Sequence, residues 1–450
     1  MSRTRELVDL DRRFLWHPFT QMRSWMRDDV VVVERGEGCW LVDTDGRRYL
    51  DGVSSLWCSV HGHRVPEIDA AIRGQLDLVA HSTLLGLASV PSIDLARRLV
   101  GLAPSGLARV FYSDSGATSV EAAIKIAFQY QRQTGRPERT RFAALGSAYH
   151  GDTVGSVSLG GIEAMHAMFA PLRFEVVRIP SPYCYRCPLG RDRASCSMEC
   201  AAEAERIIEG SASTLAGLVV EPLVQGAAGM IVQPEGYLSR IAAACRAHSV
   251  PLVADEVATG FGRTGALFAC TQESVQPDIL CLAKGLTGGY LPVAATLTTE
   301  RVFEAFLGTP DSGLAFMHGH TYTGNALGCA AALASLDLLE PMLGALPARA
   351  SRLGELLDPL RDHPHVGEIR RKGFMVGIEL VEDRETRRPY APALGMGRRT
   401  TLEARRRSVI IRPLGDVVVL NPPLAVSDEE MEILVRATAD SIEAATRAAP

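Results

Sequence analysis

Between residues 109 and 297 the chain alternates short apolar segments with segments of helical periodicity, and this rhythm restricts the fold more than any other feature. RVFYSDSG precedes EAAIKIAFQYQ, AGLVVEPLVQG precedes GYLSRIAAACRAH, and VPLVADEV is followed by DILCLAKG and PVAATL. Strands that are joined through helices pair in parallel, and the helices cover the faces of the sheet. The sequence therefore predicts an α/β fold with a mostly parallel sheet.

The two ends of the chain predict a smaller α+β unit. Residues 31–52 alternate and turn at Asp45-Gly46, which indicates a β-hairpin, and GFMVGIELVE and VIIRPLGDVVVL indicate strands near the other end. An isolated hairpin is marginally stable, so we expect it to join the C-terminal strands. The predicted division is an N-terminal arm and hairpin (1–65), a large domain (66–335) and a C-terminal small domain (336–450). Proline-led apolar patterns predict helices over 66–80 and 91–103.

Composition and charge exclude several classes of protein. The 450 residues are 47% hydrophobic and 22% charged, with a formal net charge of −5 and no long basic block, which argues against nucleic acid or an anionic membrane as partner. No apolar run reaches the length of a bilayer span, and the first residues lack a signal-peptide stretch. The ten cysteines are mostly isolated, so a disulfide framework is not expected. We therefore expect a cytoplasmic protein that acts on small molecules.

Polar residues at the predicted strand ends point to the site, because ligands of such sheets bind beyond the carboxyl ends of the strands. Asp255 follows VPLVA and Lys284 follows DILCLA. SDSGATSVEAAIK enters a helix at Gly116, where backbone N–H groups and the helix dipole favour a phosphate. Tyr149, in AYHGDT, offers a flat ring. Taken singly, these features also suit a buried ion pair, an ordinary turn and simple packing.

Together these residue types match the needs of pyridoxal phosphate. That cofactor requires a lysine amine to bind its aldehyde, a carboxylate for its pyridine nitrogen, an aromatic ring over its plane and a cup for its phosphate. Lys284, Asp255, Tyr149 and the turn at Gly116 supply these groups in turn. The lysine must be available as a free amine, so we expect its pKa to be lowered, while Asp255 stays ionised.

Two long motifs then carry a family resemblance. ADEVATGFGRTG (254–265) and AKGLTGGYLP (283–292) resemble the class III aminotransferases of the fold-type I pyridoxal phosphate enzymes, and the resemblance extends over nearly the whole chain. It implies a large domain with a mostly parallel sheet of the seven-stranded type and a smaller domain built from both termini. It also implies a homodimer with active sites at the subunit interface.

Five further stretches are similar to one branch of that family, the biotin-pathway aminotransferases that convert 8-amino-7-oxononanoate to 7,8-diaminononanoate. They are WHPFTQM (16–22), DGVSSLW (51–57), YHGDT (149–153), FMHGHTYTGN (316–325) and IRPLGD (411–416). The alternative is another class III ω-aminotransferase that acts on ornithine, 4-aminobutyrate or diamines. WHPFTQM together with SSLW favours the biotin-pathway branch.

The resemblance implies a role for each matching residue. The implied catalytic residues are Lys284, Asp255 and Tyr149. The implied cofactor contacts are Gly116, Ala117, Tyr149, Asp255, Lys284, His320 and Thr321, with Thr321 reaching the phosphate from the second subunit. The implied substrate contacts are Phe19, Leu56, Trp57, Tyr149, Asp152, Lys284, Gly319 and Arg412. A guanidinium suits the far carboxylate of a long keto acid, although Arg412 after a strand also reads as a surface arginine. Glu221 either bonds near the ring or ties two loops together.

Departures from the branch pattern concern the amino donor. Many members that use S-adenosylmethionine have tyrosine where this chain has Phe19, tryptophan where it has Leu56, and proline where it has His320. A branch that uses lysine has similar stretches. The donor predicted from the sequence is therefore S-adenosylmethionine or L-lysine, with lysine at least as well supported. Ala117 also replaces a common serine, which leaves mostly backbone donors for the phosphate.

Two clusters suggest metal sites. HGH occurs at 61–63 and at 318–320, and for these pairs we favour packing and hydrogen bonding over metal binding. Cys184, Cys187, Cys196 and Cys200 form C-x2-C-x8-C-x3-C, a spacing that is compatible with a structural zinc site. The alternatives for these four cysteines are a redox-sensitive loop and unpaired thiols. Finally, WHPFTQM is too apolar for a frayed terminus, so we expect it to form a wall of the substrate pocket or an aromatic staple.

Overall fold

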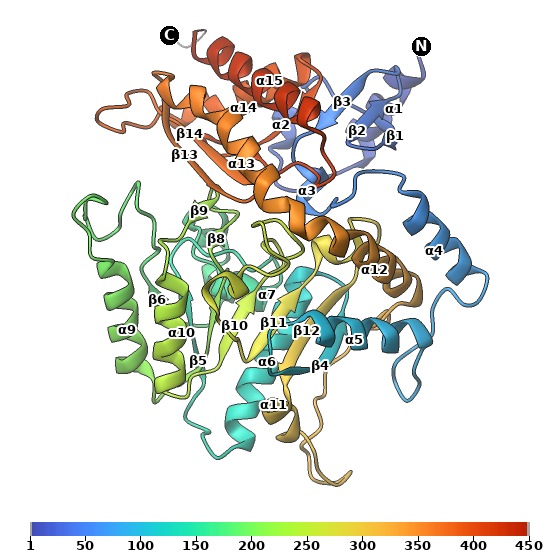
Figure 1. Ribbon diagram of the computed structural model, residues 1–450, viewed down its shortest axis with the longest axis vertical. Coiled ribbons are helices and arrows are strands. Elements are labelled where there is room, and N and C mark those ends of the chain that lie inside the picture. The colour runs from blue at the N-terminus through green and yellow to red at the C-terminus, as the bar shows by residue number, and fades with distance from the viewer. Residues whose placement is uncertain (1, 448–450) are drawn as a thin grey trace.

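A seven-stranded sheet forms the centre of the computed structural model, which describes residues 2–447 (Figure 1). Its strands, in spatial order, are β4 (Leu107–Ser113), β12 (Ala294–Thr299), β11 (Ile279–Leu282), β10 (Leu252–Asp255), β7 (Leu215–Val220), β5 (Arg141–Leu145) and β6 (Val176–Ile179). The run from β11 to β6 is parallel, whereas β12 is antiparallel to both β11 and β4. The prediction of an α/β fold with a mostly parallel sheet is therefore confirmed.

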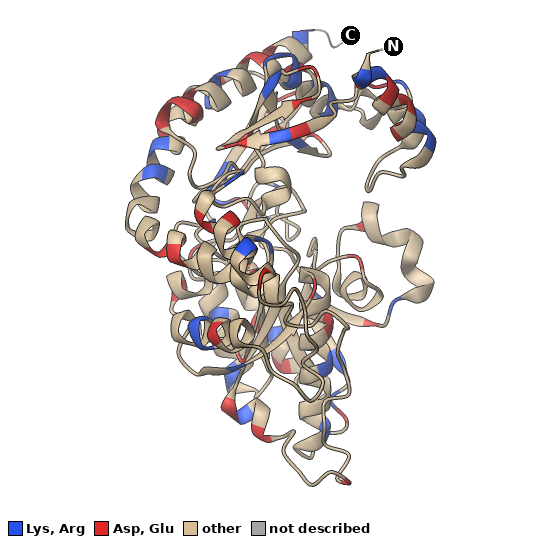
Figure 2. Ribbon diagram, turned by 90° about the vertical axis from the view of Figure 1, so that its right-hand side faces the viewer, with Lys and Arg blue, Asp and Glu red and all other residues tan. Residues whose placement is uncertain are grey.

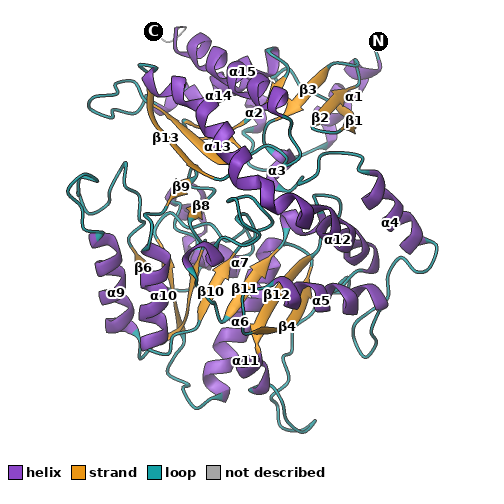
Figure 3. Ribbon diagram, in the orientation of Figure 1, coloured by secondary structure: helices purple, strands orange, loops and turns teal. Residues whose placement is uncertain are grey.

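Helices cover both faces of this sheet (Figure 3) because successive side chains of a strand point to opposite faces. In β7, Val219 packs in the cluster that includes α6, whereas Leu218 and Val220 pack in the cluster that includes α9, α10 and α12. The helices of this part are α4 (Pro66–Leu76), α5 (Val90–Leu102), α6 (Gly116–Gln133), α7 (Val154–Leu159), α8 (Glu163–His166), α9 (Glu199–Ser211), α10 (Tyr237–Ala247), α11 (Glu300–Glu304) and α12 (Ala326–Leu339).

A second layer contains the N-terminal and C-terminal elements, at the upper right and upper left of Figure 1. One sheet has the order β1 (Val33–Glu37), β2 (Trp40–Asp43), β3 (Arg48–Asp51), β15 (Val409–Ile410), and the other has the order β13 (Val366–Lys372), β14 (Met375–Leu380), β17 (Val417–Leu420), β16 (Arg412–Leu414). β15 pairs in parallel with β3. The N-terminal hairpin therefore joins C-terminal strands, as expected.

Several short and terminal helices complete the fold. They are α1 (Arg3–Phe14), α2 (Met22–Trp25), α3 (Ser54–Trp57), α13 (Leu346–Leu357), α14 (Met396–Arg406) and α15 (Asp428–Arg447). The sequence patterns did not predict α1, whose described side chains include no buried residue. Acidic and basic residues are interspersed along the outer helices (Figure 2). The predicted helices over 66–80 and 91–103 are α4 and α5, and the domain limits at 65 and 335 stay a prediction.

The stretch 326–362 is long and apolar enough to span a membrane by length and composition, because an 18-residue window within it has a mean hydropathy of 1.5. Its first part, α12, packs against α4, α5 and the turn that begins at Lys284. Several of its side chains are fully buried, among them Cys329, Leu336 and Leu339. This position is that of a core helix in a globular protein.

Candidate functional site

A cavity of about 650 Å³ opens at the carboxyl ends of β10 and β11. The predicted site residues that line it are Trp57, Gly116, Ala117, Tyr149, Asp152, Asp255 and Lys284. They come from five separate stretches of the chain and meet where a ligand of a parallel sheet is expected. The cavity holds the acid, the amine, the aromatic ring and the helix N-terminus that the sequence placed at the strand ends.

Lys284 lies two residues beyond the end of β11 and begins a short 3-10 turn, Lys284–Thr287. Its φ of 45° is in the left-handed region, which a non-glycine residue adopts only when the surrounding structure holds it there. Its Nζ atom lies 5.7 Å from the centre of the Trp57 ring. Burial lowers the pKa of the Lys284 ammonium, against the opposing charges of Asp255 and Glu221. The side chain is therefore suited to act as a free amine.

Asp255 is the last residue of β10 and is buried. Its Oδ2 atom lies 2.7 Å from Nδ1 of His150, and its Oδ1 atom accepts a hydrogen bond of 3.1 Å from the backbone N–H of Val257. Nε2 of His150 has no hydrogen-bond partner within the part of the chain that the structure describes. These contacts fix the carboxylate as an acceptor that faces the cavity. His150 was missed from the sequence, although it adjoins Tyr149.

Tyr149 is held at both ends. Its hydroxyl donates to Oδ2 of Asp152 at 2.6 Å, and its backbone N–H donates to Oε2 of Glu221 at 3.1 Å. Burial and the bond to Asp152 raise the pKa of Tyr149, so the phenol stays protonated. The other Glu221 oxygen accepts from the backbone N–H of Gly226 at 2.9 Å. Of the two readings of Glu221, the structure supports the one in which it ties two loops together.

The titration of Glu221 gives a stability prediction. Burial raises its pKa to about 7 from the ordinary 4.5. Below about pH 4.5 both folded and unfolded chains keep the proton; as the pH rises towards 7, only the unfolded chain ionises freely, so the folded state loses up to about 3 kcal/mol. Glu221→Gln should remove this loss. We expect the unfolding midpoint of the variant, relative to that of wild type, to increase as the pH rises from roughly 5 to 8. A difference between the two midpoints that does not change with pH would contradict this.

The N-terminus of α6 forms the phosphate-sized corner of the cavity. Ser115 and Thr118 make reciprocal capping bonds there, which leave the N–H groups of the first helical residues free of helix partners. A Cβ atom on Gly116 would lie 2.4 Å from Cγ1 of Val257, so only glycine fits the approach. An unsubstituted backbone at a helix N-terminus is a site for an anion.

These residues fit pyridoxal phosphate. The amine with a lowered pKa, the buried carboxylate fixed by His150, the Tyr149 ring and the open helix N-terminus all line one cavity. Its volume of about 650 Å³ lies within the range of small-molecule sites. A phosphorylated pyridine needs two kinds of partner, and the cavity has both: a helix N-terminus that suits the phosphate and a carboxylate that suits the ring nitrogen.

The remaining predicted contacts do not line the cavity in the single chain. Arg412 is half-buried, its guanidinium lies 5.9 Å from the Phe19 ring, and burial lowers its pKa while Tyr149 opposes this. Leu56 and Phe19 are exposed. Gly319 and Thr321 are also exposed, and Thr321 accepts a hydrogen bond from His81 through its backbone oxygen. Their predicted roles stay predictions.

The WHPFTQM stretch is not buried within the chain. Trp16 is 88% exposed and Phe19 is 59% exposed. His17 bonds to Asp11 at 2.8 Å and packs against Trp25 at 4.1 Å between ring centres. His17 is thus held by other residues of the N-terminal arm, and both interpretations of the stretch, a pocket wall and a staple that pins the arm to the small domain, stay predictions.

Both His-x-His pairs are engaged in hydrogen bonds. His61 bonds to Ser335, His63 to Asp51, His318 to Lys125 and His320 to Asp114. Burial lowers the pKa of His61 to about 4. The preference for packing and hydrogen bonding over metal binding is supported for both pairs.

The zinc site expected at the four cysteines is not supported. Within residues 2–447 no group of three or more His, Cys, Asp or Glu residues is arranged to hold a metal ion. The four thiols are free and line a cavity of about 210 Å³. Arg191 and Arg193 line the same cavity, and their positive charges disfavour a bound cation. Cys196 instead donates to the carboxylate of Glu199 at 2.8 Å.

Comparisons with known proteins agree with this site. The family described as aminotransferase class III matches residues 22–442. Among curated proteins, the adenosylmethionine-8-amino-7-oxononanoate aminotransferase of Nitratidesulfovibrio vulgaris is 60% identical over 99% of this chain and 83% of its own length. The protein of the same name from Geobacter sulfurreducens is 52% identical over 98% of both chains.

Solved structures give the same picture. The crystal structure of adenosylmethionine-8-amino-7-oxononanoate aminotransferase from Methanocaldococcus jannaschii superposes with a TM-score of 0.94 at 43% identity, and covers 98% of this chain and 99% of its own. An (S)-enantioselective omega-transaminase from Thermomicrobium roseum has a TM-score of 0.93 at 37% identity, with 99% of both chains covered. The fold is thus shared by aminotransferases with different names.

Proposed function

Since the chain belongs to the class III aminotransferase family, we infer that it transfers an amino group to 8-amino-7-oxononanoate and so forms 7,8-diaminononanoate for biotin biosynthesis. The observation that carries this inference is identity of 44–60% over nearly the full length with relatives named for that reaction. The cavity supports it with the amine, acid and anion corner that the chemistry needs. The same comparison favours this reaction over the other ω-aminotransferase reactions.

Class III aminotransferases use pyridoxal phosphate, and we propose which residues hold it here. The N–H groups at Gly116 and Ala117 bind the phosphate, Asp255 accepts a hydrogen bond from the pyridine nitrogen, and Tyr149 covers the ring. When bound, the cofactor withdraws electrons from the substrate carbon and carries the amino group between donor and acceptor. His150 holds the Asp255 carboxylate in place, since it bonds to the oxygen that Val257 leaves open.

Lys284 has two tasks in this proposal. Its amine would hold the cofactor through the aldehyde group, and its Nζ would move a proton to or from the substrate carbon. Burial lowers the pKa of Lys284, which favours the unprotonated amine. The two half-reactions share the site, so we expect ping-pong kinetics.

We propose that Arg412 binds the far carboxylate of the keto acid. Support comes from its half-buried position beside Phe19 and near Tyr149. Trp57 forms the apolar wall of the cavity, and Leu56 and Asp152 complete the substrate side. Arg412→Met should raise KM for the keto acid by about 10–100-fold with a smaller effect on kcat, because one charged hydrogen-bonded contact is lost. Arg436→Met, exposed on α15, is the matched control; equal KM values in both variants would contradict the assignment.

We further propose a homodimer in which Gly319, His320 and Thr321 of one subunit complete the other subunit's site. In support, this segment is largely exposed in the single chain, and large apolar side chains beside it are exposed as well. They are Leu78, Leu85, Leu87, Val90, Met317 and Tyr322. His81 bonds to Thr321, so these two exposed segments are neighbours, and exposed apolar side chains on neighbouring segments are typical of an interface.

We propose that L-lysine serves as the amino donor at least as well as S-adenosylmethionine, the compound after which the relatives are named. Phe19 offers no hydroxyl and Leu56 no indole for an adenosyl group. Mixing the cofactor-loaded enzyme with each donor alone should bleach the visible absorbance of the cofactor with lysine. Bleaching by S-adenosylmethionine only would refute the lysine proposal.

We also propose a cytoplasmic location, because all ten cysteines are free, as is typical of proteins in a reducing compartment.

The function itself is tested by complementing a biotin auxotroph that lacks this step. We expect rescue by the wild-type chain and none by Lys284→Ala. Failure of the soluble, cofactor-loaded protein to rescue, together with turnover of ornithine or 4-aminobutyrate, would replace the proposed substrate.

A further inference from the structure

Two buried charges connect the C-terminal sheet to a wall of the site. Arg370 of β13 and Glu379 of β14 are each 6% exposed. Nη1 of Arg370 donates to Oε2 of Glu379 at 2.6 Å and to Oε2 of Glu368 at 2.9 Å. Burying such a pair costs desolvation free energy, and apolar residues would often replace it without loss of stability. Its presence therefore calls for a role beyond stability.

The geometry of Arg370 supplies that role. Its Nε donates to the backbone oxygen of Gly229 at 2.7 Å. Gly229 lies in the turn between β8 (Val224–Gln225) and β9 (Ile231–Val232), and its φ of 101° is accessible mainly to glycine. A Cβ atom on Gly229 would lie 3.1 Å from Nη2 of Arg370. The Arg370 guanidinium therefore bonds both to Glu379 of β14 and to the turn between β8 and β9.

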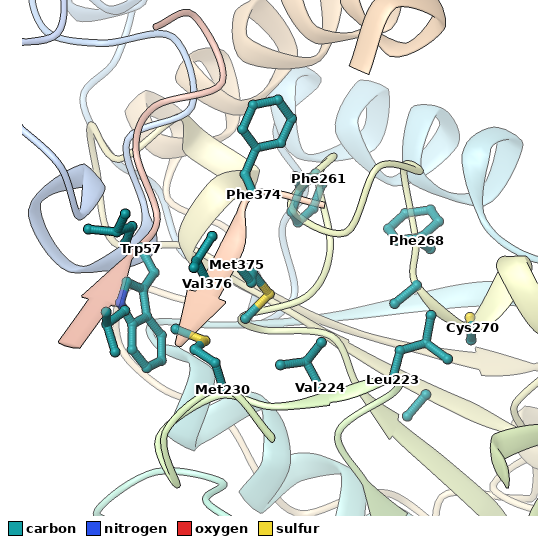
Figure 4. Close-up of a cluster of buried hydrophobic side chains, with 14 of the residues drawn as sticks. Trp57, Leu223, Val224, Met230, Phe261, Phe268, Cys270, Phe374, Met375 and Val376 are labelled. Atoms are coloured by element: carbon teal, nitrogen blue, oxygen red, sulfur yellow. The ribbon is translucent and has the colours of Figure 1, made fainter. Parts of the chain in front are cut away.

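The hairpin turn is part of the site. Ala227 lines the cavity, and a Cβ atom on Gly226 would lie 3.1 Å from Cζ3 of Trp57. Figure 4 shows Met230 of the same hairpin beside the Trp57 ring, with Met375 of β14 near both. Moving this turn therefore moves the surface on which Trp57 rests.

The same turn is bonded to the loop of Tyr149. The backbone N–H of Gly226 donates to Glu221, whose other oxygen accepts from the N–H of Tyr149. Gly229 and Met230 both donate to the oxygen of Gly226, at 3.1 and 2.9 Å, which closes the turn. A continuous series of hydrogen bonds therefore runs from Arg370 to the backbone of Tyr149.

The cysteine-bearing loop completes the arrangement. The hydroxyl of Tyr183 donates to Glu379, and Nε of Arg186 donates to the same carboxylate at 2.5 Å. The Tyr183 ring lies 5.0 Å from the Arg370 guanidinium. With Glu368, two acids and two arginines balance in charge around Glu379, while Nη2 of Arg370 has no hydrogen-bond partner among the described residues.

We propose that Arg370 is a positioning residue for amino transfer: paired with Glu379, it fixes the Gly226–Gly229 turn and thereby the Trp57 and Tyr149 walls of the site. This inference rests on the proposed function for its kinetic consequence. Its structural consequence, an ordered hairpin, holds for the chain without substrate or cofactor. The two consequences are measured separately.

The test replaces the pair by Arg370→Leu with Glu379→Leu in one chain. Apolar partners avoid a buried unpaired charge, so the thermal midpoint should stay near that of wild type. We expect amide hydrogen exchange in residues 221–232 of the cofactor-free protein to rise by about tenfold or more, since the turn loses the guanidinium that binds the backbone oxygen of Gly229. We also expect KM for the amino acceptor to rise about tenfold.

Glu368→Gln is the matched control, because Glu368 bonds to Arg370 without touching the hairpin. It should leave exchange and kinetics as in wild type. If the double variant does not fold, Arg370→Lys serves instead, because a lysine keeps the charge near Glu379 but lacks the guanidinium fork; it should give the same rise in exchange. Wild-type exchange and KM in a folded variant would overturn the proposal. If amide hydrogen exchange rises in the variant but the wild-type enzyme does not convert 8-amino-7-oxononanoate, only the proposed function is refuted.

Discussion

Replacing Lys284 by alanine should lower kcat by roughly four orders of magnitude, because the variant loses both the amine that holds the cofactor and the group that moves the proton. The chain has three lysines. Among the described residues, Lys284 is the only lysine that lines the cavity, so the site offers no second amine. Lys125 bonds to His318, and Lys372 lies at the end of β13.

Those two residues provide the controls. Lys125→Ala and Lys372→Ala should keep the visible absorbance of the bound cofactor, and Lys372→Ala should keep full activity. Borohydride reduction of the wild-type holoenzyme should fix the cofactor on the peptide that contains Lys284 and on neither of the other two. Attachment elsewhere, or an active Lys284→Ala variant, would refute the assignment.

Replacing Asp255 by asparagine should lower kcat by about 10²–10³-fold, because a preformed charge that faces the developing charge of the reaction is lost. The amide also changes the contact with His150, which now meets a neutral partner at 2.7 Å. Cofactor affinity should fall as well, and titration with pyridoxal phosphate measures this. Asp440→Asn, exposed on α15, is the control; full activity of Asp255→Asn would show that the carboxylate has no such role.

Much of this site was predictable because its parts obey a local rule. Asp255 and Lys284 each follow a buried strand, and parallel strands bring their carboxyl ends to one edge of the sheet. The turn at Gly116 needs only its neighbours to form the start of α6. Each of these features is determined within about ten residues of sequence, so reading the chain segment by segment is sufficient to place them.

Other features depend on partners that are far away in the sequence. His150 bonds to Asp255 across 105 residues, and Arg370 reaches Gly229 across 141. Nothing near His150 or Arg370 in the sequence indicates these contacts. A spacing rule alone also predicted zinc at the four cysteines, because it takes no account of Arg191 and Arg193 at the same cavity.

The N-terminus illustrates a third limit. The helix α1 was missed because its residues are mostly charged and it buries no side chain, so hydrophobic periodicity gives no signal. Trp16 and Phe19 stay largely exposed when residues 2–447 are folded. On the dimer proposal, a second copy of the chain supplies a surface that covers them, which no single-chain pattern reports.

The central claim is that the Lys284 and Asp255 cavity aminates 8-amino-7-oxononanoate. The most direct measurement is mass spectrometry of the product after the purified, cofactor-loaded enzyme is incubated with this keto acid and with lysine or S-adenosylmethionine. We expect 7,8-diaminononanoate from the wild-type enzyme and from Lys372→Ala, and none above background from Lys284→Ala. Absence of the product with the wild-type enzyme under both donors, or its undiminished formation by Lys284→Ala, would contradict the claim.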